Sequence, residues 1–215
     1  MTHCLLATII VAGALLATSA DAQRLTFSDA PIDGVPKDFV TALTGQGRPG
    51  KWVVQEDASA ESKRVLAQID RDPTDYRFPL AIYGPTFPSD VEVTTRLKPV
   101  SGKVDQAGGV IVRLIDRNNY YLARANALEN NVHFYRVVHG NRQELAGADI
   151  KVAKGVWHTL TLRAEGDRFS ISFNGKVLFM HTDRTFNSPG KIALWTKADS
   201  VTRFDWIDIR SLQGK

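Results

Sequence analysis

The chain has 215 residues, of which 43% are hydrophobic and 23% are charged, with 16 glycines and 9 prolines. These values are typical of folded soluble proteins and exclude disordered, collagen-like and coiled-coil chains. The 27 lysines and arginines against 23 aspartates and glutamates leave a net charge of +4, and the basic residues are scattered along the chain. Because no basic run alternates with aromatic residues, we expect no nucleic-acid partner.

Residues 1–22 differ from the rest and are predicted to form a secretory signal peptide. Residues 5–16 carry no charge, and small residues follow up to Ala22, so cleavage is expected before Gln23. This apolar stretch is too short to span a bilayer, and no second one follows it. We therefore expect a periplasmic or secreted protein without a membrane span.

The only cysteine, Cys4, lies within this predicted signal peptide. The exported chain would therefore have no disulfide, no zinc–cysteine site and no cysteine nucleophile. Residues 23–215 contain neither an internal repeat nor a linker. We expect them to form a single domain, which at this length buries a sizeable core.

From residue 51 onward, short segments rich in β-branched and aromatic residues alternate apolar with polar side chains and are bounded by turn residues. Asn174-Gly175, between two such segments, is typical of a two-residue hairpin turn. Residues 29–50, rich in Gly, Pro and Asp, are expected to be irregular. The pattern predicts an all-β fold, a two-sheet antiparallel jelly-roll sandwich. The predicted strands are 51–56, 64–70, 90–98, 110–115, 120–125, 132–138, 157–163, 168–173, 176–181, 191–197 and 203–210.

Three stretches of the sequence resemble a known superfamily. They are AGGVIVRLIDRNNYYLARANALENNVHFYRV (107–137), GVWHTLTLRAEGDRFSISFNGKVLFMHTD (155–183) and GKIALWTKADSVTRFDWIDI (190–209). Together they resemble bacterial domains of the concanavalin A-like lectin/glucanase superfamily, in particular laminin G-like and 3-keto-disaccharide hydrolase-like domains. The resemblance implies the jelly-roll fold. It does not fix the activity, because the superfamily contains sugar binders, glycoside hydrolases and interaction modules.

The turns in the middle of the chain predict which side chains share a face. A loop at 116–119 would place Ile111 opposite Arg124, and a connection at 126–131 would place Arg124 opposite His133 and Leu122 opposite Tyr135. One face then carries Ile111, Arg113, Ile115, Tyr120, Leu122, Arg124, His133 and Tyr135. The other face is mostly apolar and is expected to lie between the two sheets.

The first face is the predicted binding site. Arginines, histidine and tyrosines on a concave sheet suit a sugar, whose hydroxyls bind planar donors and whose C–H faces stack on rings. In this register neither Arg113 nor Arg124 has a carboxylate opposite it, so we expect both charges to be available to a ligand. The alternative is that these residues form ordinary cross-strand pairs on a solvated face. The candidate ligand-binding residues are Arg113, Tyr120, Arg124, Asn126, Glu129, His133, Tyr135, Trp195 and Lys197.

Several of these candidates have an alternative structural interpretation. Asn126, Glu129 and Asn131 either form a polar rim with Asp105 or simply close turns. Trp195 is either a stacking platform beside Lys197 or part of the core.

Evidence for catalysis or a metal is weaker. The Glu-x-Asp-x-x-Glu strand motif of the glucanase branch is absent, and the nearest carboxylate pair is Asp90 and Glu92. The alternative is that Glu92 pairs with Arg96 or Arg113 across the sheet and Asp90 ends a turn. We expect no metal or cofactor, because the histidines lack metal-ligand spacing. A calcium ion, as in some relatives of this fold, would have oxygen ligands available from Asp116, Asn118 and Asp183.

Three functions follow as hypotheses. The first is an exported carbohydrate- or glycoconjugate-binding protein that uses the concave sheet face. The second, implied by the resemblance, is a glycoside hydrolase or lyase of the 3-keto-disaccharide type, so whether the protein is an enzyme stays open. The third is a protein-interaction module of the cell envelope.

Overall fold

The computed structural model describes residues 22–212, and the rest of the predicted signal peptide, residues 1–21, lies outside them. The described residues form fifteen strands without a helix, so none of them forms a helix that could cross a membrane. In chain order the strands are β1 (Ala22–Thr26), β2 (Phe39–Gly45), β3 (Trp52–Glu56), β4 (Arg64–Gln68), β5 (Arg77–Phe87), β6 (Val91–Ser101), β7 (Ala107–Asp116), β8 (Asn119–Asn126), β9 (Asn131–Val138), β10 (Asn141–Asp149), β11 (His158–Glu165), β12 (Arg168–Phe173), β13 (Lys176–Thr182), β14 (Gly190–Thr196) and β15 (Val201–Ser211).

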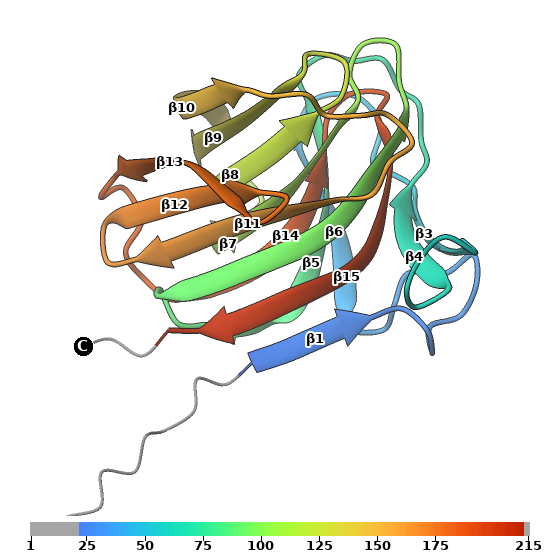
Figure 1. The fold of residues 1–215 in the computed structure, drawn as a ribbon, viewed down its shortest axis with the longest axis horizontal. Coiled ribbons are helices and arrows are strands. Elements are labelled where there is room, and N and C mark those ends of the chain that lie inside the picture. The colour runs from blue at the N-terminus through green and yellow to red at the C-terminus, as the bar shows by residue number, and fades with distance from the viewer. Residues whose placement is uncertain (1–21, 213–215) are drawn as a thin grey trace, which may run out of the picture.

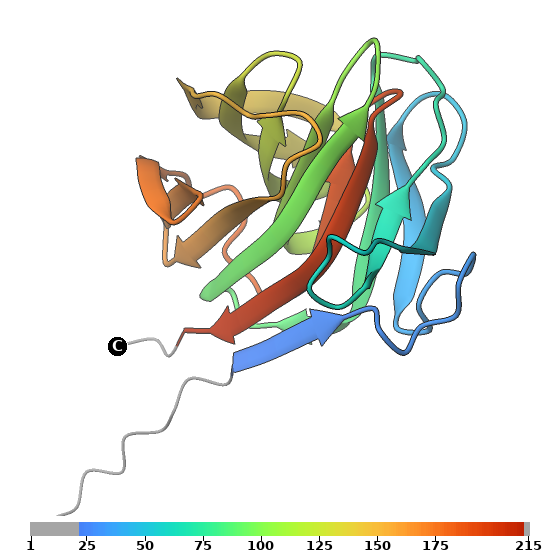
Figure 2. The ribbon, with the colours of Figure 1, turned by 45° about the vertical axis from the view of Figure 1, so that its right-hand side comes forward.

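The strands form two antiparallel sheets that face each other. One is a seven-stranded sheet in the order β10-β9-β8-β7-β14-β5-β2, and the other is an eight-stranded sheet in the order β13-β12-β11-β6-β15-β4-β3 with β1 also paired to β15. In Figure 1, β6, β11 and β15 of the eight-stranded sheet lie in front of β5, β7 and β14, and Figure 2 shows the two layers from the side. The predicted all-β jelly-roll sandwich is confirmed.

All eleven predicted strands are present, with ends shifted by a few residues, but β1, β2, β5 and β10 were not predicted. Residues 29–50 were expected to be irregular, and this is wrong for Phe39–Gly45, which form β2. The first seven residues of β5 are all buried, so that strand does not alternate, and it contains two prolines. The edge strand β10 has no fully buried residue and is mostly polar, so it lacks the apolar alternation that marks a strand.

The larger apolar core fills the space between the sheets, as the alternation along β8 and β9 predicts. Tyr121 and Phe134 of the seven-stranded sheet pack on Phe169 of the eight-stranded sheet, with ring centroids 4.4 and 4.9 Å from that ring. All three side chains are at most 1% exposed. Burying each such ring contributes about 1.5–3 kcal/mol to stability, so these contacts hold the two sheets face to face.

A second apolar core covers the other face of the seven-stranded sheet, where an open groove was expected. Its centre includes Ile111 and Leu122, both fully buried. Tyr76, which precedes β5, packs on Phe78 at a centroid distance of 4.8 Å. Its hydroxyl donates to the Gly140 carbonyl (3.0 Å) in the β9–β10 hairpin. A side chain from the β4–β5 connection thus reaches the β9–β10 hairpin, and the concave face of the sheet is filled in the middle by its own side chains.

The pairing of β8 with β9 is the one predicted, with Arg124 opposite His133 and Leu122 opposite Tyr135. The pairing of β7 with β8 differs from the prediction, because Ile111 lies opposite Leu122 and not opposite Arg124. The register shifts between Val112 and Asp116, so residues 113–115 bulge out of the ladder. The predicted Asn174-Gly175 turn is present, with positive φ angles of 49° and 77°.

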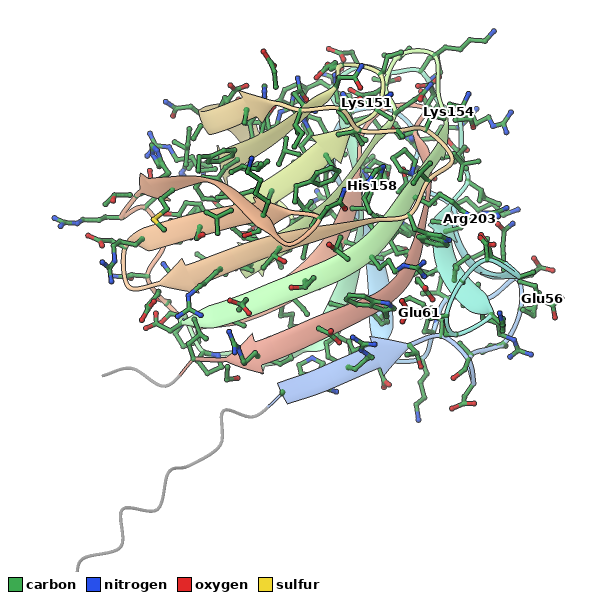
Figure 3. All side chains as sticks on the ribbon, viewed as in Figure 1. Glu56, Glu61, Lys151, Lys154, His158 and Arg203 are labelled. Carbon is green, nitrogen blue, oxygen red and sulfur yellow. The ribbon has the colours of Figure 1, made fainter. Side chains whose placement is uncertain are left out.

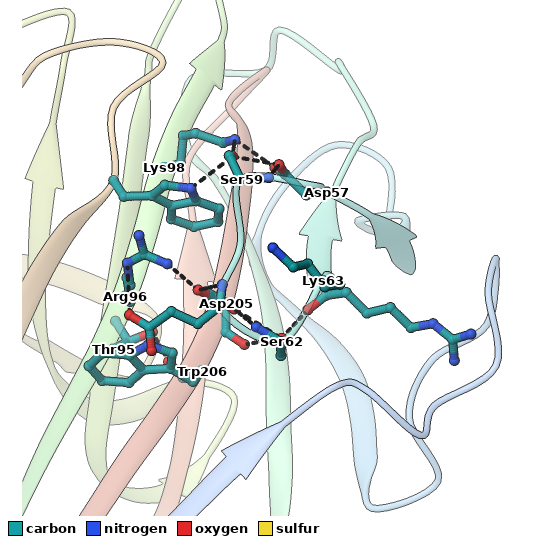
Figure 4. A network of polar contacts seen from close by, with 12 residues as sticks. Asp57, Ser59, Ser62, Lys63, Thr95, Arg96, Lys98, Asp205 and Trp206 are labelled. Carbon is teal, nitrogen blue, oxygen red and sulfur yellow. Dashed lines mark hydrogen bonds and ion pairs between the residues drawn. The ribbon is translucent and has the colours of Figure 1, made fainter.

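A buried carboxylate holds the β3–β4 connection, residues 57–63, against the eight-stranded sheet (Figure 4). Asp205 of β15 is fully buried. It accepts hydrogen bonds from the backbone N–H groups of Glu61 (2.8 Å) and Ser62 (3.3 Å). It also accepts one from the Arg96 guanidinium, so its charge is fully partnered within the protein.

A second carboxylate, Asp57, fixes the start of the same connection (Figure 4). It accepts hydrogen bonds from Lys98 Nζ (2.6 Å) and Arg203 Nη1 (2.9 Å). Burial opposes the ionisation of Asp57, but the hydrogen bonds from Lys98, Ser59 and Arg203 outweigh it and hold the pKa below its usual range. This face of the molecule is therefore stabilised by ionic contacts that require charged carboxylates.

Candidate functional site

Most of the predicted site residues meet at the end of the seven-stranded sheet where β8 ends and β9 begins. We call this set the Arg124 cluster. Its members are Asp75, Asp105, Arg124, Asn126, Glu129, Asn131, His133, Tyr135, Glu144 and Lys197.

Arg124 is the centre of the cluster and is 4% exposed. Its Nη1 donates to Asn131 Oδ1 (2.8 Å), and its Nη2 donates to Glu129 Oε2 (2.8 Å) and to Tyr135 Oη (3.0 Å). The expectation that Arg124 has no carboxylate neighbour is therefore wrong, because the β8–β9 loop folds back over it. Partial burial opposes the ionisation of Glu129, but the charge and hydrogen bond of Arg124 outweigh it and lower the pKa of this carboxyl group.

The contacts continue from Arg124 through Tyr135 to β10. His133 Nδ1 lies 3.0 Å from Tyr135 Oη and 2.9 Å from a carboxylate oxygen of Glu144. Gly147 leaves room for the imidazole, because a Cβ atom there would lie 2.4 Å from His133 Cδ2. Burial raises the pKa of Tyr135 against the opposing effect of Arg124, so its hydroxyl stays protonated at neutral pH. The Glu144 side chain is 51% exposed and faces solvent from a fixed position.

On the other side of Arg124, Asp105 and Asp75 contact the two remaining predicted residues of the cluster, Asn126 and Lys197. The buried Asn126 donates to Asp105 Oδ1 (2.8 Å). Lys197 Nζ lies 3.0 Å from Asp105 Oδ2 and 2.7 Å from Asp75 Oδ1. Burial raises the pKa of Asp105, although Lys197 opposes this shift. Asp75 is 75% exposed along its side chain and gives the cluster a further carboxylate at the surface.

Arg113 is not part of this cluster, contrary to the prediction. It lies at the β7 bulge with a φ angle of 51° and is 2% exposed. Its guanidinium donates to three backbone carbonyls, those of Ser89 (2.8 Å), Phe186 (2.8 Å) and Gly166 (2.7 Å). It therefore ties three connections together at the other end of the sandwich and is not available to a ligand on the concave face.

Tyr120 and Trp195 lie on the predicted face but inside the second core. Both are fully buried. Trp195 stacks on Phe78 with centroids 5.4 Å apart, and the Tyr120 hydroxyl lies 3.0 Å from Thr44 Oγ1. Tyr120 is therefore not available to a ligand, contrary to the prediction, and Trp195 matches the alternative that places it in the core.

The two catalytic candidates lie away from the Arg124 cluster. Glu92, on β6 of the other sheet, pairs with Arg163 (3.2 Å) and Arg210 (2.8 Å). Asp90 precedes the same strand and accepts a hydrogen bond from the Gly166 N–H (2.9 Å). Both positions match the alternative interpretation of these carboxylates as an ion-pair partner and a turn residue, although the arginines that pair with Glu92 are not the predicted ones.

The possible calcium ligands also have protein partners. Asp116 Oδ1 accepts hydrogen bonds from the Asn118 backbone N–H (2.7 Å) and from Asn119 Nδ2 (3.0 Å), which closes the β7–β8 turn. Asp183 pairs with Arg136 at 2.9 Å. Among residues 22–212, no group of three His, Cys, Asp or Glu side chains is arranged to hold a metal ion.

Comparison with known proteins defines the class of fold. The chain is a concanavalin A-like jelly-roll sandwich, the architecture shared by carbohydrate-binding modules and glucanases. No family model and no curated protein matches it.

Three solved structures illustrate the likeness. The carbohydrate-binding module CBM66 from Bacillus subtilis superposes with a TM-score of 0.62 at 20% identity, over 78% of this chain and 92% of that one. The β-glucanase of Bacillus licheniformis superposes with a TM-score of 0.60 at 12% identity, over 91% and 100%. Domain 4 of AbnA, an extracellular arabinanase from Geobacillus stearothermophilus in complex with arabinotriose, gives 0.57 at 13% identity, over 87% and 90%. At these identities the likeness establishes the fold alone.

Proposed function

We propose that this protein is exported and binds a carbohydrate at the Arg124 cluster. The observation that carries the proposal is the pair of half-exposed carboxylates, Glu129 (43%) and Glu144 (51%), each held in place by a more buried partner, Arg124 or His133. Sugar hydroxyls donate charge-assisted hydrogen bonds to such carboxylates. Because the carboxylates are already oriented, binding would cost little side-chain entropy.

The fold supports this proposal by analogy. Two of the similar structures are named as a carbohydrate-binding module and as an arabinanase domain holding arabinotriose. Their ligands serve as first probes for this chain, together with β-1,3-1,4-glucan, the substrate in the name of another similar structure.

The first prediction tests the two carboxylates. We expect Glu129→Gln and Glu144→Gln together to weaken binding of the recognised saccharide at least about tenfold, which is about 1.4 kcal/mol. Each glutamine keeps an oxygen acceptor but loses the charge. Isothermal titration calorimetry against arabinan and β-1,3-1,4-glucan oligosaccharides would measure the effect.

The matched control is Glu56→Gln, a carboxylate on the eight-stranded sheet that is also exposed. It should leave affinity unchanged. If the doubly substituted protein binds as tightly as the unaltered protein, the Arg124 cluster is not the binding site.

One observation favours the alternative of a glycoside hydrolase or lyase. Within the cluster the pKa of Asp105 is raised by burial while that of Glu129 is lowered by Arg124. Two carboxyl groups with pKa values shifted apart are what an acid and a base require. Sugar released from the same saccharides, or from 3-keto glucosides, would favour this alternative over binding alone.

Export gives a second prediction. Residues 1–22 fused to a reporter should direct it out of the cytoplasm, and intact-mass measurement of the exported protein should place its first residue at Gln23. Gln23 is the second residue of β1 and pairs with Ile209. Reporter retained in the cytoplasm with Met1 intact would exclude the signal peptide.

A further inference from the structure

A basic cleft opens at the end of the sandwich that also carries the Arg124 cluster. Its volume is about 610 Å³. Three connections form it: β4–β5, β6–β7 and β10–β11, together with Asp199 between β14 and β15. The lining residues are Arg71, Pro73, Ser101, Gly102, Lys103, Val104, Lys154 and Asp199.

Three basic side chains of the cleft have no direct partner among the described residues. Arg71, Lys103 and Lys154 are all exposed, and none of these side chains has a hydrogen bond or ion pair to another residue in the range 22–212. Figure 3 labels Lys154 on the β10–β11 connection, at this end of the molecule. The guanidinium groups of Arg113 and Arg124, by contrast, donate hydrogen bonds within the protein.

The one acidic residue of the cleft, Asp199, is turned toward the backbone. It is 7% exposed, and its carboxylate accepts hydrogen bonds from the N–H groups of Lys103 (2.6 Å) and Val104 (3.0 Å). Gly102 lets the loop close this tightly, because a Cβ atom there would lie 1.7 Å from the Asp105 carbonyl oxygen. Asp199 thus holds in place the loop that presents Lys103, and its one negative charge against three positive charges leaves the cleft lining with a net charge of +2.

The same connections serve both the cleft and the Arg124 cluster. The β6–β7 connection carries Lys103 in the cleft and Asp105 in the cluster, and the β4–β5 connection carries Arg71 in the cleft and Asp75 in the cluster. The cleft and the Arg124 cluster therefore lie at the same end of the sandwich and share two connections.

We propose that the basic cleft binds an oxyanion group, a carboxylate or a sulfate ester, of an acidic saccharide. The inference rests on the proposed carbohydrate binding and adds the class of ligand. A single-stranded nucleic acid is disfavoured, because no aromatic side chain lines the cleft to stack on a base.

The test removes two cleft charges with Lys103→Gln and Lys154→Gln and measures binding of polygalacturonate oligosaccharides and of their methyl esters, which lack the charge. We expect the doubly substituted protein to bind the acid form at least about tenfold more weakly and the methyl ester as before. The matched control, Lys37→Gln with Lys176→Gln, removes the same charge from exposed lysines outside the cleft and should leave both affinities unchanged. Dextran sulfate in place of polygalacturonate distinguishes a sulfate from a carboxylate.

Equal weakening by the cleft and control pairs would overturn the inference, since it would reflect net charge alone. Equally tight binding of a single-stranded oligonucleotide of the same charge would overturn the assignment to a saccharide. If neutral saccharides bind through Glu129 and Glu144 while the cleft substitutions change nothing, only this inference fails. If no saccharide binds at all, the proposed function fails with it.

Discussion

Replacing Asp205 with alanine should lower the free energy of unfolding by about 3–5 kcal/mol, the range for removing one partner of a buried ion pair. Asp205 is fully buried, and its loss removes the acceptor of two backbone N–H groups of the β3–β4 connection. It also leaves the Arg96 guanidinium with only its longer ion pair to Glu61, at 3.6 Å. Urea denaturation followed by tryptophan fluorescence would measure the change.

Asp208→Ala is the matched control, because Asp208 lies on the same strand and also pairs with an arginine, Arg24, at 2.6 Å. Its side chain is 38% exposed, so its loss should cost about 1 kcal/mol or less. Similar losses for the two substitutions would show that burial of Asp205 does not determine its contribution.

Arg113→Met should cost about 3 kcal/mol of stability and leave saccharide affinity unchanged in the folded protein. The methionine fills much of the same volume but cannot donate to the carbonyls of Ser89, Phe186 and Gly166, which then lose their partner. Denaturation and calorimetry on the same protein separate the two effects.

The control for Arg113 is Arg184→Met, which removes an arginine that is 83% exposed and pairs with Asp167. That substitution should change stability by about 0.5 kcal/mol or less. A folded Arg113→Met protein that no longer binds saccharide would return Arg113 to the binding site.

The strands β7, β8 and β14 are buried on both faces, and they were predicted from their β-branched and aromatic residues and from the turns that bound them. Alternation of more and less buried residues is the signal for β11 and β12, whose predicted ends differ from the observed ones by at most two residues. It fails for β5, which is buried on both faces at its start, and for the exposed edge strand β10. The register of β7 could not be predicted, because a bulge leaves no regular trace in the alternation.

The site could be predicted only in part for a related reason. Arg124, His133 and Tyr135 share a face because neighbouring strands pair in the predicted register. Their carboxylate partners come from a loop and from the unpredicted strand β10. Tyr120 and Trp195 are packed against residues far away in the sequence, Thr44 and Phe78 respectively. Local sequence pattern carries no information on such long-range contacts.

The position of β15 has a consequence for the order in which the protein can fold. The last strand to be synthesised lies in the middle of the eight-stranded sheet, between β6 on one side and β4 and β1 on the other. Ala22 at the start of β1 pairs with Arg210, so the sheet keeps a gap at its centre until almost the whole chain has left the ribosome. Pairing between such distant segments is slow. The eight-stranded sheet can therefore be completed only after β15 has been synthesised, so the central pairings of this sheet form late.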